Sequence, residues 1–171
     1  MLHHLILSVL SDDNPGVVDA IAHAIYTQDG YWLASHLAQL GGKFAGVIHV
    51  GVHAERSEDL RAQLEALSKK SIQVSVEQVS EGNLNANTVT ATFSAIGPDR
   101  PGIIKELSTA FAQRHINLTE LETRLSSAPY SGEPLFEATG ELALPSSLDM
   151  DDLEEQLDDI ANSLALDVNL T

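Results

Sequence analysis

The sequence contains no cysteine among its 171 residues. Disulfide bonds, thiolate nucleophiles and zinc sites built on thiolates are therefore excluded. Common catalytic motifs are also missing, since there is no Gly-x-Ser-x-Gly elbow, phosphate-binding P-loop or His-Glu-x-x-His sequence. We expect a protein that is not an enzyme and that carries no cofactor.

Basic residues are scarce, with 9 Lys and Arg against 25 Asp and Glu and a formal charge of -16. Both halves are acidic: residues 1–83 carry 10 acids and 5 bases, and residues 84–171 carry 15 acids and 4 bases. Nucleic-acid binding requires clustered Lys and Arg that neutralise phosphates. Beyond Lys69 and Lys70 we find no basic patch, and we expect no direct contact with nucleic acid.

Long apolar runs are absent as well. The N-terminal stretch MLHHLILSVLSDDN lacks a basic n-region and a small-residue cleavage site, and its apolar part is too short to cross a bilayer. Hydrophobic residues still make up 43% of the chain, which is enough for a folded core. We expect a soluble cytoplasmic protein that does not bind a membrane.

The chain does contain an internal repeat. An offset of 86 positions (94 − 8) aligns Ser8 with Ser94, and it also aligns the junction DNPG at 13–16 with DRPG at 99–102. Between the copies lies the polar stretch SEGNLNAN. We predict two domains over residues 1–80 and 88–171 with a linker over 81–87. Each domain is small, so we expect the halves to pack on each other or on a second chain in a homodimer.

Hydrophobic periodicity predicts the order β-α-β-β-α-β in both copies, an α+β fold of two tandem ferredoxin-like units. In the first copy we expect strands over 2–10, 31–38, 44–52 and 71–79, and helices over 16–28 and from an N-cap at Ser57. In the second we expect strands over 88–96, 117–125, 134–144 and 164–170, and helices over 102–114 and 148–162. Met150, Leu153, Leu157, Ile160 and Leu164 should form the apolar face of the last helix.

Each Asp-x-Pro-Gly junction joins an expected strand to an expected helix. We expect the proline at the first helical position, and the glycine lets a ligand approach the N–H groups of residues 16–18 and 102–104. The helix dipole favours a carboxylate there. Alternatively, Pro-Gly only shapes a turn, and Asp13 or Asn14 only caps the helix.

The two junctions differ in one residue that matters for ligand binding. The first has Asn14, a good capping residue, where the second has Arg100, which can pair with a carboxylate. At the start of the next strand the second copy has Asn117 and the first has Tyr31. If only one junction binds an amino acid, we therefore favour the second.

These features resemble tandem ACT-domain proteins. The duplication, the element order and both junctions match the ACT pattern, and LGGKFAGVIHV (40–50) and APYSGEPLF (128–136) resemble the glycine cleavage system transcriptional repressors. The resemblance implies a negative regulator that senses glycine and acts through a LysR-type transcriptional activator. It implies that ligand-binding residues come from both junctions and one strand start: Asp13, Asn14, Pro15, Gly16, Val17, Asp99, Arg100, Pro101, Gly102, Ile103, Ile104 and Asn117.

Other interpretations stay open at this point. The chain could be a free-standing ACT-domain sensor that regulates a metabolic enzyme, or a catalytic protein that uses a carboxylate pair. The acidic run DMDDLEEQLDD (149–159) is either a solvated helix face or a docking surface for a basic partner. The loop SSAPYSGEP (126–134) is either a contact loop or a permissive hairpin extension.

The seven histidines do not predict a metal site. His49 and His53 are four residues apart in an expected strand, hence about 13 Å apart, which is too far to share an ion. His3 and His4 are adjacent and point to opposite faces of a strand. We expect no bound metal.

Overall fold

A computed structural model describes residues 1–79 and 89–170 of the protein. The chain divides into two compact units, Met1–Ala86 and Asn87–Thr171. Each unit has the element order β-α-β-β-α-β around a four-stranded antiparallel sheet. The predicted α+β fold of two tandem ferredoxin-like units is therefore confirmed. The predicted linker over 81–87 lies outside the described residues.

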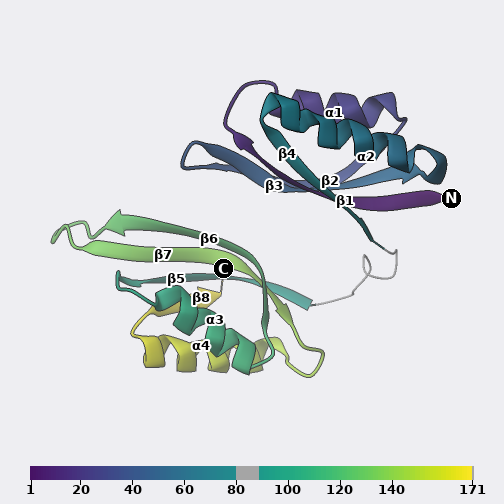
Figure 1. Ribbon diagram of the computed structural model, residues 1–171. Helices are drawn as coiled ribbons and strands as arrows, with labels where there is room; N and C mark the ends of the chain where they lie inside the picture. Colours follow the sequence, from purple (N-terminus) through teal and green to yellow (C-terminus); the bar gives the residue numbers. More distant parts are fainter. Residues whose placement is uncertain (80–88, 171) are drawn as a thin grey trace. The chain divides into compact units, whose positions relative to one another are not determined.

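The first unit is a sheet of order β2-β3-β1-β4 with both helices on one face (Figure 1). Its elements are β1 (Leu2–Asp12), α1 (Val17–Thr27), β2 (Tyr31–Leu40), β3 (Lys43–His53), the short 3-10 helix η1 (Ala54–Arg56), α2 (Ser57–Ala66), the 3-10 helix η2 (Leu67–Lys70) and β4 (Ile72–Val79). Alternate residues of β1, such as Leu5 and Leu7, are fully buried against Ile21 and Leu64 of the helices. The other face of the sheet carries no helix.

The second unit repeats this arrangement in the order β6-β7-β5-β8. Its elements are β5 (Val89–Pro98), α3 (Ile103–Gln113), β6 (Asn117–Ser127), β7 (Pro134–Leu144), α4 (Met150–Leu164) and β8 (Asp167–Leu170). Figure 1 shows α3 and α4 on the same face of this sheet. Phe93 of β5 and Phe111 of α3 pack edge to face with ring centroids 5.2 Å apart at the centre of the core.

Two details of the predicted helices are wrong. Ser57 is not an N-cap: the 3-10 turn at Ala54–Arg56 leads directly into α2, so Ser57 lies inside the helix and is buried. Met150 is not part of the core, because it is the first residue of α4, where the unit covers the helix less fully, and its side chain is 43% exposed. Asp149 caps this helix instead by accepting a hydrogen bond from the Asp152 N–H at 2.9 Å.

The hairpin between β6 and β7 is longer than its counterpart in the first unit. β2 and β3 are joined by Gly41 and Gly42 alone, both with positive φ. In the second unit residues 128–133 make the connection, and Tyr130 at its tip is fully exposed. Among residues 1–79 and 89–170, no helix combines the length and apolar character needed to span a bilayer.

Candidate functional site

Both Asp-x-Pro-Gly junctions use glycine, not proline, to begin the helix. Gly16 and Gly102 are the N-cap residues of α1 and α3, with φ of 95° and 93°. This left-handed conformation favours glycine, which has no Cβ. Pro15 and Pro101 precede the cap, so their expected position inside the helix is wrong. No side chain caps either helix, so neither Asp13 nor Asn14 fills the role that the purely structural interpretation gave it.

The first N–H groups of both helices lie outside the i to i−4 hydrogen-bond pattern. The first i to i−4 bonds run from Ala20 N–H to the Gly16 carbonyl at 2.9 Å and from Glu106 N–H to the Gly102 carbonyl at 3.0 Å. The N–H groups ahead of them have no acceptor within the helix. Val17 and Ile103 are buried and anchor each helix start. Both junctions therefore present amides and a positive helix end to an anion.

A groove of about 620 Å³ opens at the first junction. Its walls come from the end of β1, from α1, and from α2 with η2. The lining residues are Ser11, Asp12, Asn14, Pro15, Gly16, Val17, Asp19, Ala20, His23, Ala24, Thr27, Gln63, Ala66, Leu67, Lys70, Ser71 and Ile72. Four of the five first-junction residues named by the family resemblance, Asn14 to Val17, thus line one groove, and Asp13 does not.

Charges of both signs border this groove. The side chain of Lys70, at the end of η2, forms no ion pair or hydrogen bond with any described residue. Asp19 lies in the first turn of α1, and Asp12 is paired with Lys43. Thr27 donates a hydrogen bond to Gln63 at 2.8 Å and so links α1 to α2. A zwitterion such as an amino acid fits this mixture better than a simple anion, which Asp19 would repel.

At the second junction the side chain of Arg100 is engaged by other groups of the protein. The Arg100 guanidinium donates two hydrogen bonds to the Glu106 carboxylate, at 3.0 and 2.6 Å, and a third to the Leu164 carbonyl at 3.3 Å. Hydrogen bonding between these two side chains lowers the pKa of Glu106 and raises the pKa of Arg100. The pair is about 40% exposed, but its bidentate geometry is specific. A ligand carboxylate would have to displace Glu106 to reach Arg100.

Three substitutions between the copies explain this difference. The offset of 86 aligns Asn14 with Arg100 and Ala20 with Glu106, so the first junction has neither member of the ion pair. In the sheets, Leu10 pairs with Gln73 and Ile96 pairs with Asp167, which aligns Lys70 with Leu164. The first unit therefore has a free cation beside a groove, and the second has a cation bound to its own helix. Lys70 was missed because only the sheet register brings it to the first junction. Glu106, in the first turn of α3, was missed because the sequence analysis did not consider an ion pair with Arg100.

Asn117 does not lie at the second junction of its own unit. It pairs with Ala143, which pairs with Thr90 near the start of β5, whereas the junction follows Pro98 at the other end. Eight residues along a strand separate the two levels by about 26 Å. The structure thus gathers Asp99 to Ile104 at one end of the second unit and Asn117 at the opposite end.

The comparisons with known proteins agree with this topology. Residues 3–77 match the family model described as the ACT domain. The first unit therefore matches the ACT domain model over most of its length. The second unit has the same element order and the same sheet order, so the chain is a tandem of ACT-like units. No match was found among curated proteins.

Two solved structures resemble this ACT tandem over nearly its whole length. An unknown protein from Galdieria sulphuraria is 25% identical with a TM-score of 0.84, and the match covers 99% of this chain and 98% of that one. A crystal structure described as a "putative glycine cleavage system transcriptional repressor" is 17% identical with a TM-score of 0.75, covering 100% of this chain and 97% of that one. At that identity the second likeness establishes the shared fold.

Proposed function

We propose that this tandem ACT protein is a negative regulator of transcription of the glycine cleavage system, that it responds to glycine, and that it acts through a LysR-type activator. The first unit belongs to a domain family that binds amino-acid effectors. The full-length similarity to a protein described as a repressor of that system supports the specific role. The acidic chain, at a formal charge of -16, supports action through a partner instead of through DNA contact.

The observation that carries the proposal is the groove at the first junction. It combines the free amides at the start of α1 with the unpaired Lys70 and with space for a small zwitterion. The groove supports an effector site in the first unit, whereas the sequence favoured the second unit because of Arg100. The change of site follows from the ion pair between Arg100 and Glu106, which leaves Arg100 without a free donor face for a ligand.

Calorimetry with glycine tests the site. Glycine has five non-hydrogen atoms, so a ceiling of about 1.5 kcal/mol per atom limits its dissociation constant to a few micromolar at best, and we expect about 10 µM to a few millimolar. Lys70→Gln should weaken binding by about tenfold, because it removes the free cation. Lys69→Gln is the matched control: the residue is exposed, adjacent, and outside the groove lining, so affinity should stay at the wild-type value.

Glycine substitutions separate the two junctions. Gly16→Val puts a branched side chain at a positive φ beside the groove and should abolish binding, while Gly102→Val should leave the affinity within twofold. Circular dichroism must show that both variants are folded. If Gly102→Val abolishes binding and Gly16→Val does not, the effector binds in the second unit and the assignment to the groove is wrong.

Affinity capture from a lysate, with and without millimolar glycine, tests the partner. We expect a LysR-type activator to be retained in a glycine-dependent manner. Retention of a metabolic enzyme with no transcription factor would support the alternative, a free-standing ACT-domain sensor that regulates an enzyme. Failure of glycine to bind in the calorimeter would reject the effector without deciding the partner.

A further inference from the structure

Two histidines that are 45 residues apart in the sequence meet on the helix-free face of the first sheet. His4 Nδ1 lies 2.9 Å from His49 Nε2, and the ring centroids are 5.1 Å apart. His4 lies on β1 and His49 on β3, the two central strands of the sheet. His4 pairs with Gly51 in the register and His49 pairs with Ile6, so the two rings meet on a diagonal. From the sequence we compared His49 only with His53, so the pair of His4 and His49 was not predicted.

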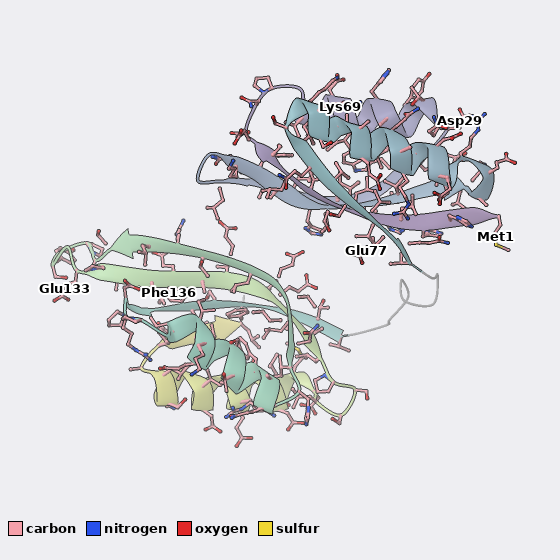
Figure 2. The ribbon with its side chains drawn as sticks, viewed as in Figure 1. Met1, Asp29, Lys69, Glu77, Glu133 and Phe136 are labelled. Carbon is pink, nitrogen blue, oxygen red and sulfur yellow. The ribbon has the colours of Figure 1, made fainter. Side chains whose placement is uncertain are left out.

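Apolar side chains pack beside the histidine pair at Gly51. Gly51, opposite His4, has no side chain, and a Cβ there would lie 3.0 Å from Leu2 and 3.3 Å from Leu33. Both histidines are half-buried, and each lies on a central strand of the sheet. Figure 2 shows Glu77, which pairs with Ile6, on this same helix-free side of the sheet. Its carboxylate adds a favourable field for a cation.

The distance between the nitrogens suits two ligands of one metal ion. Two zinc–nitrogen bonds of about 2.0–2.1 Å that meet at a right angle place the nitrogens about 2.9 Å apart, and the tetrahedral angle requires about 3.3 Å. Rotation of both rings brings the nitrogens to that separation and turns the lone pairs away from the line of the hydrogen bond toward one ion. In the metal-free pair one nitrogen must donate its proton to the other. With zinc bound, each neutral ring carries its proton on the other nitrogen, and both lone pairs face the ion.

We propose that His4 and His49 form a binding site for a divalent cation of the zinc class, with water completing the coordination. Imidazole is a preferred ligand for such ions. Among the described residues no group of three or more His, Cys, Asp or Glu side chains converges on one point. Among the described residues the site therefore has two protein ligands, and we expect a dissociation constant for Zn²⁺ on the order of 10–100 µM, far weaker than four-ligand structural sites.

Zinc titration of the full chain at about pH 7.5 tests the site by NMR of the imidazole nitrogens. Because Zn²⁺ is diamagnetic, the resonances of His4 Nδ1 and His49 Nε2 should shift together and saturate with one ion. The melting temperature should rise by about 5 °C at a zinc concentration tenfold above the dissociation constant, since the ion binds only the folded unit.

His49→Asn and His4→Gln should each weaken zinc binding at least tenfold. His53→Asn is the matched control, because His53 lies on the same strand and face as His49 but about 13 Å along it, and its affinity should be unchanged. The proposal is overturned if the wild-type His4 and His49 resonances do not respond to millimolar zinc. Wild-type affinity in His49→Asn, or shifts confined to other histidines, would overturn it equally, and neither result depends on the glycine response.

Discussion

The two units have the same backbone junction but differ in single side chains beside it. Gly16 and Gly102 adopt nearly identical left-handed conformations, and both begin a helix without a side-chain cap. What differs is the residue two positions before the glycine, Asn14 in one unit and Arg100 in the other. Arg100 pairs with Glu106 on the following helix, so its guanidinium is already engaged. The same motif thus borders a groove in the first unit and an ion pair in the second.

A half-buried histidine should make the stability of the first unit depend on pH. Burial, together with the charge of His4, lowers the pKa of His49 from its ordinary value of 6.5. The folded unit therefore binds this proton less readily than the unfolded chain, so stability is full above about pH 6.5 and decreases as the pH falls below it. Urea unfolding at about pH 7.5 and 5.5 should show a smaller loss in His49→Asn than in wild type. His4→Asn should be intermediate, and an equal loss in all three proteins would contradict the prediction.

Gly140 is predicted to be essential for the second unit for a steric reason. A Cβ at this position would lie 2.1 Å from the Glu120 carbonyl oxygen and 2.9 Å from the ring of Phe93. Because backbone must move to relieve the first contact, Gly140→Ala should lower the free energy of unfolding by about 2 kcal/mol or more. Thr139→Ala, an exposed neighbour on β7, is the control and should change it by less than about 0.5 kcal/mol. Chemical denaturation of both variants measures the difference.

Helix α4 has one apolar, buried face and one acidic, exposed face. Leu153, Leu157 and Ile160 are buried against the second sheet, while the acidic residues of the same helix are exposed. A solvated face accounts for these charges without any partner. The alternative is that α4 docks a basic surface, and charge substitution distinguishes the two.

The prediction for α4 follows from electrostatic steering. If the helix docks the proposed partner, replacing Asp151, Asp152, Glu155 and Asp159 by Asn or Gln should slow association several-fold and flatten its salt dependence. All four side chains are exposed, so the fold should persist. The matched control neutralises four exposed acids of the first unit, Glu55, Glu58, Asp59 and Glu65. Equal rates for both variants would show that α4 is only a solvated face.

The net negative charge of the whole molecule disfavours direct contact with nucleic acid. Acids outnumber bases in both repeats, and the total formal charge is -16. Such a surface repels phosphates over about one Debye length, 8–10 Å at physiological salt. A transcriptional role for this ACT tandem therefore requires a second protein that supplies the DNA contacts.

The corresponding prediction is that the purified chain alone does not shift promoter DNA at any salt concentration. Binding through phosphates would show a steep loss of affinity with salt, because counterions are released. A mobility-shift titration between about 50 and 200 mM salt tests this, with the chain plus its captured partner as the positive sample. A salt-sensitive shift by the chain alone would contradict action through a partner.

The repeat, the α+β class and the order of the elements could be predicted from the sequence, because alternation in strands and helical periodicity are local patterns. Both junctions could also be located, since their positive φ favours glycine. The predicted ends of the helices were less accurate, as Ser57 and Met150 show. Where a helix begins, and whether its first side chain is buried, depends on packing against the rest of the unit.

Which junction borders a free lysine depends on tertiary contacts. Arg100 also donates a hydrogen bond to the Leu164 carbonyl, 64 residues away, and Lys70 reaches the groove only through the register of β1 with β4. The same register separates Asn117 from the second junction and brings His4 to His49 across β1 and β3. These contacts join segments that are distant in the chain, and local periodicity contains no information about their pairing.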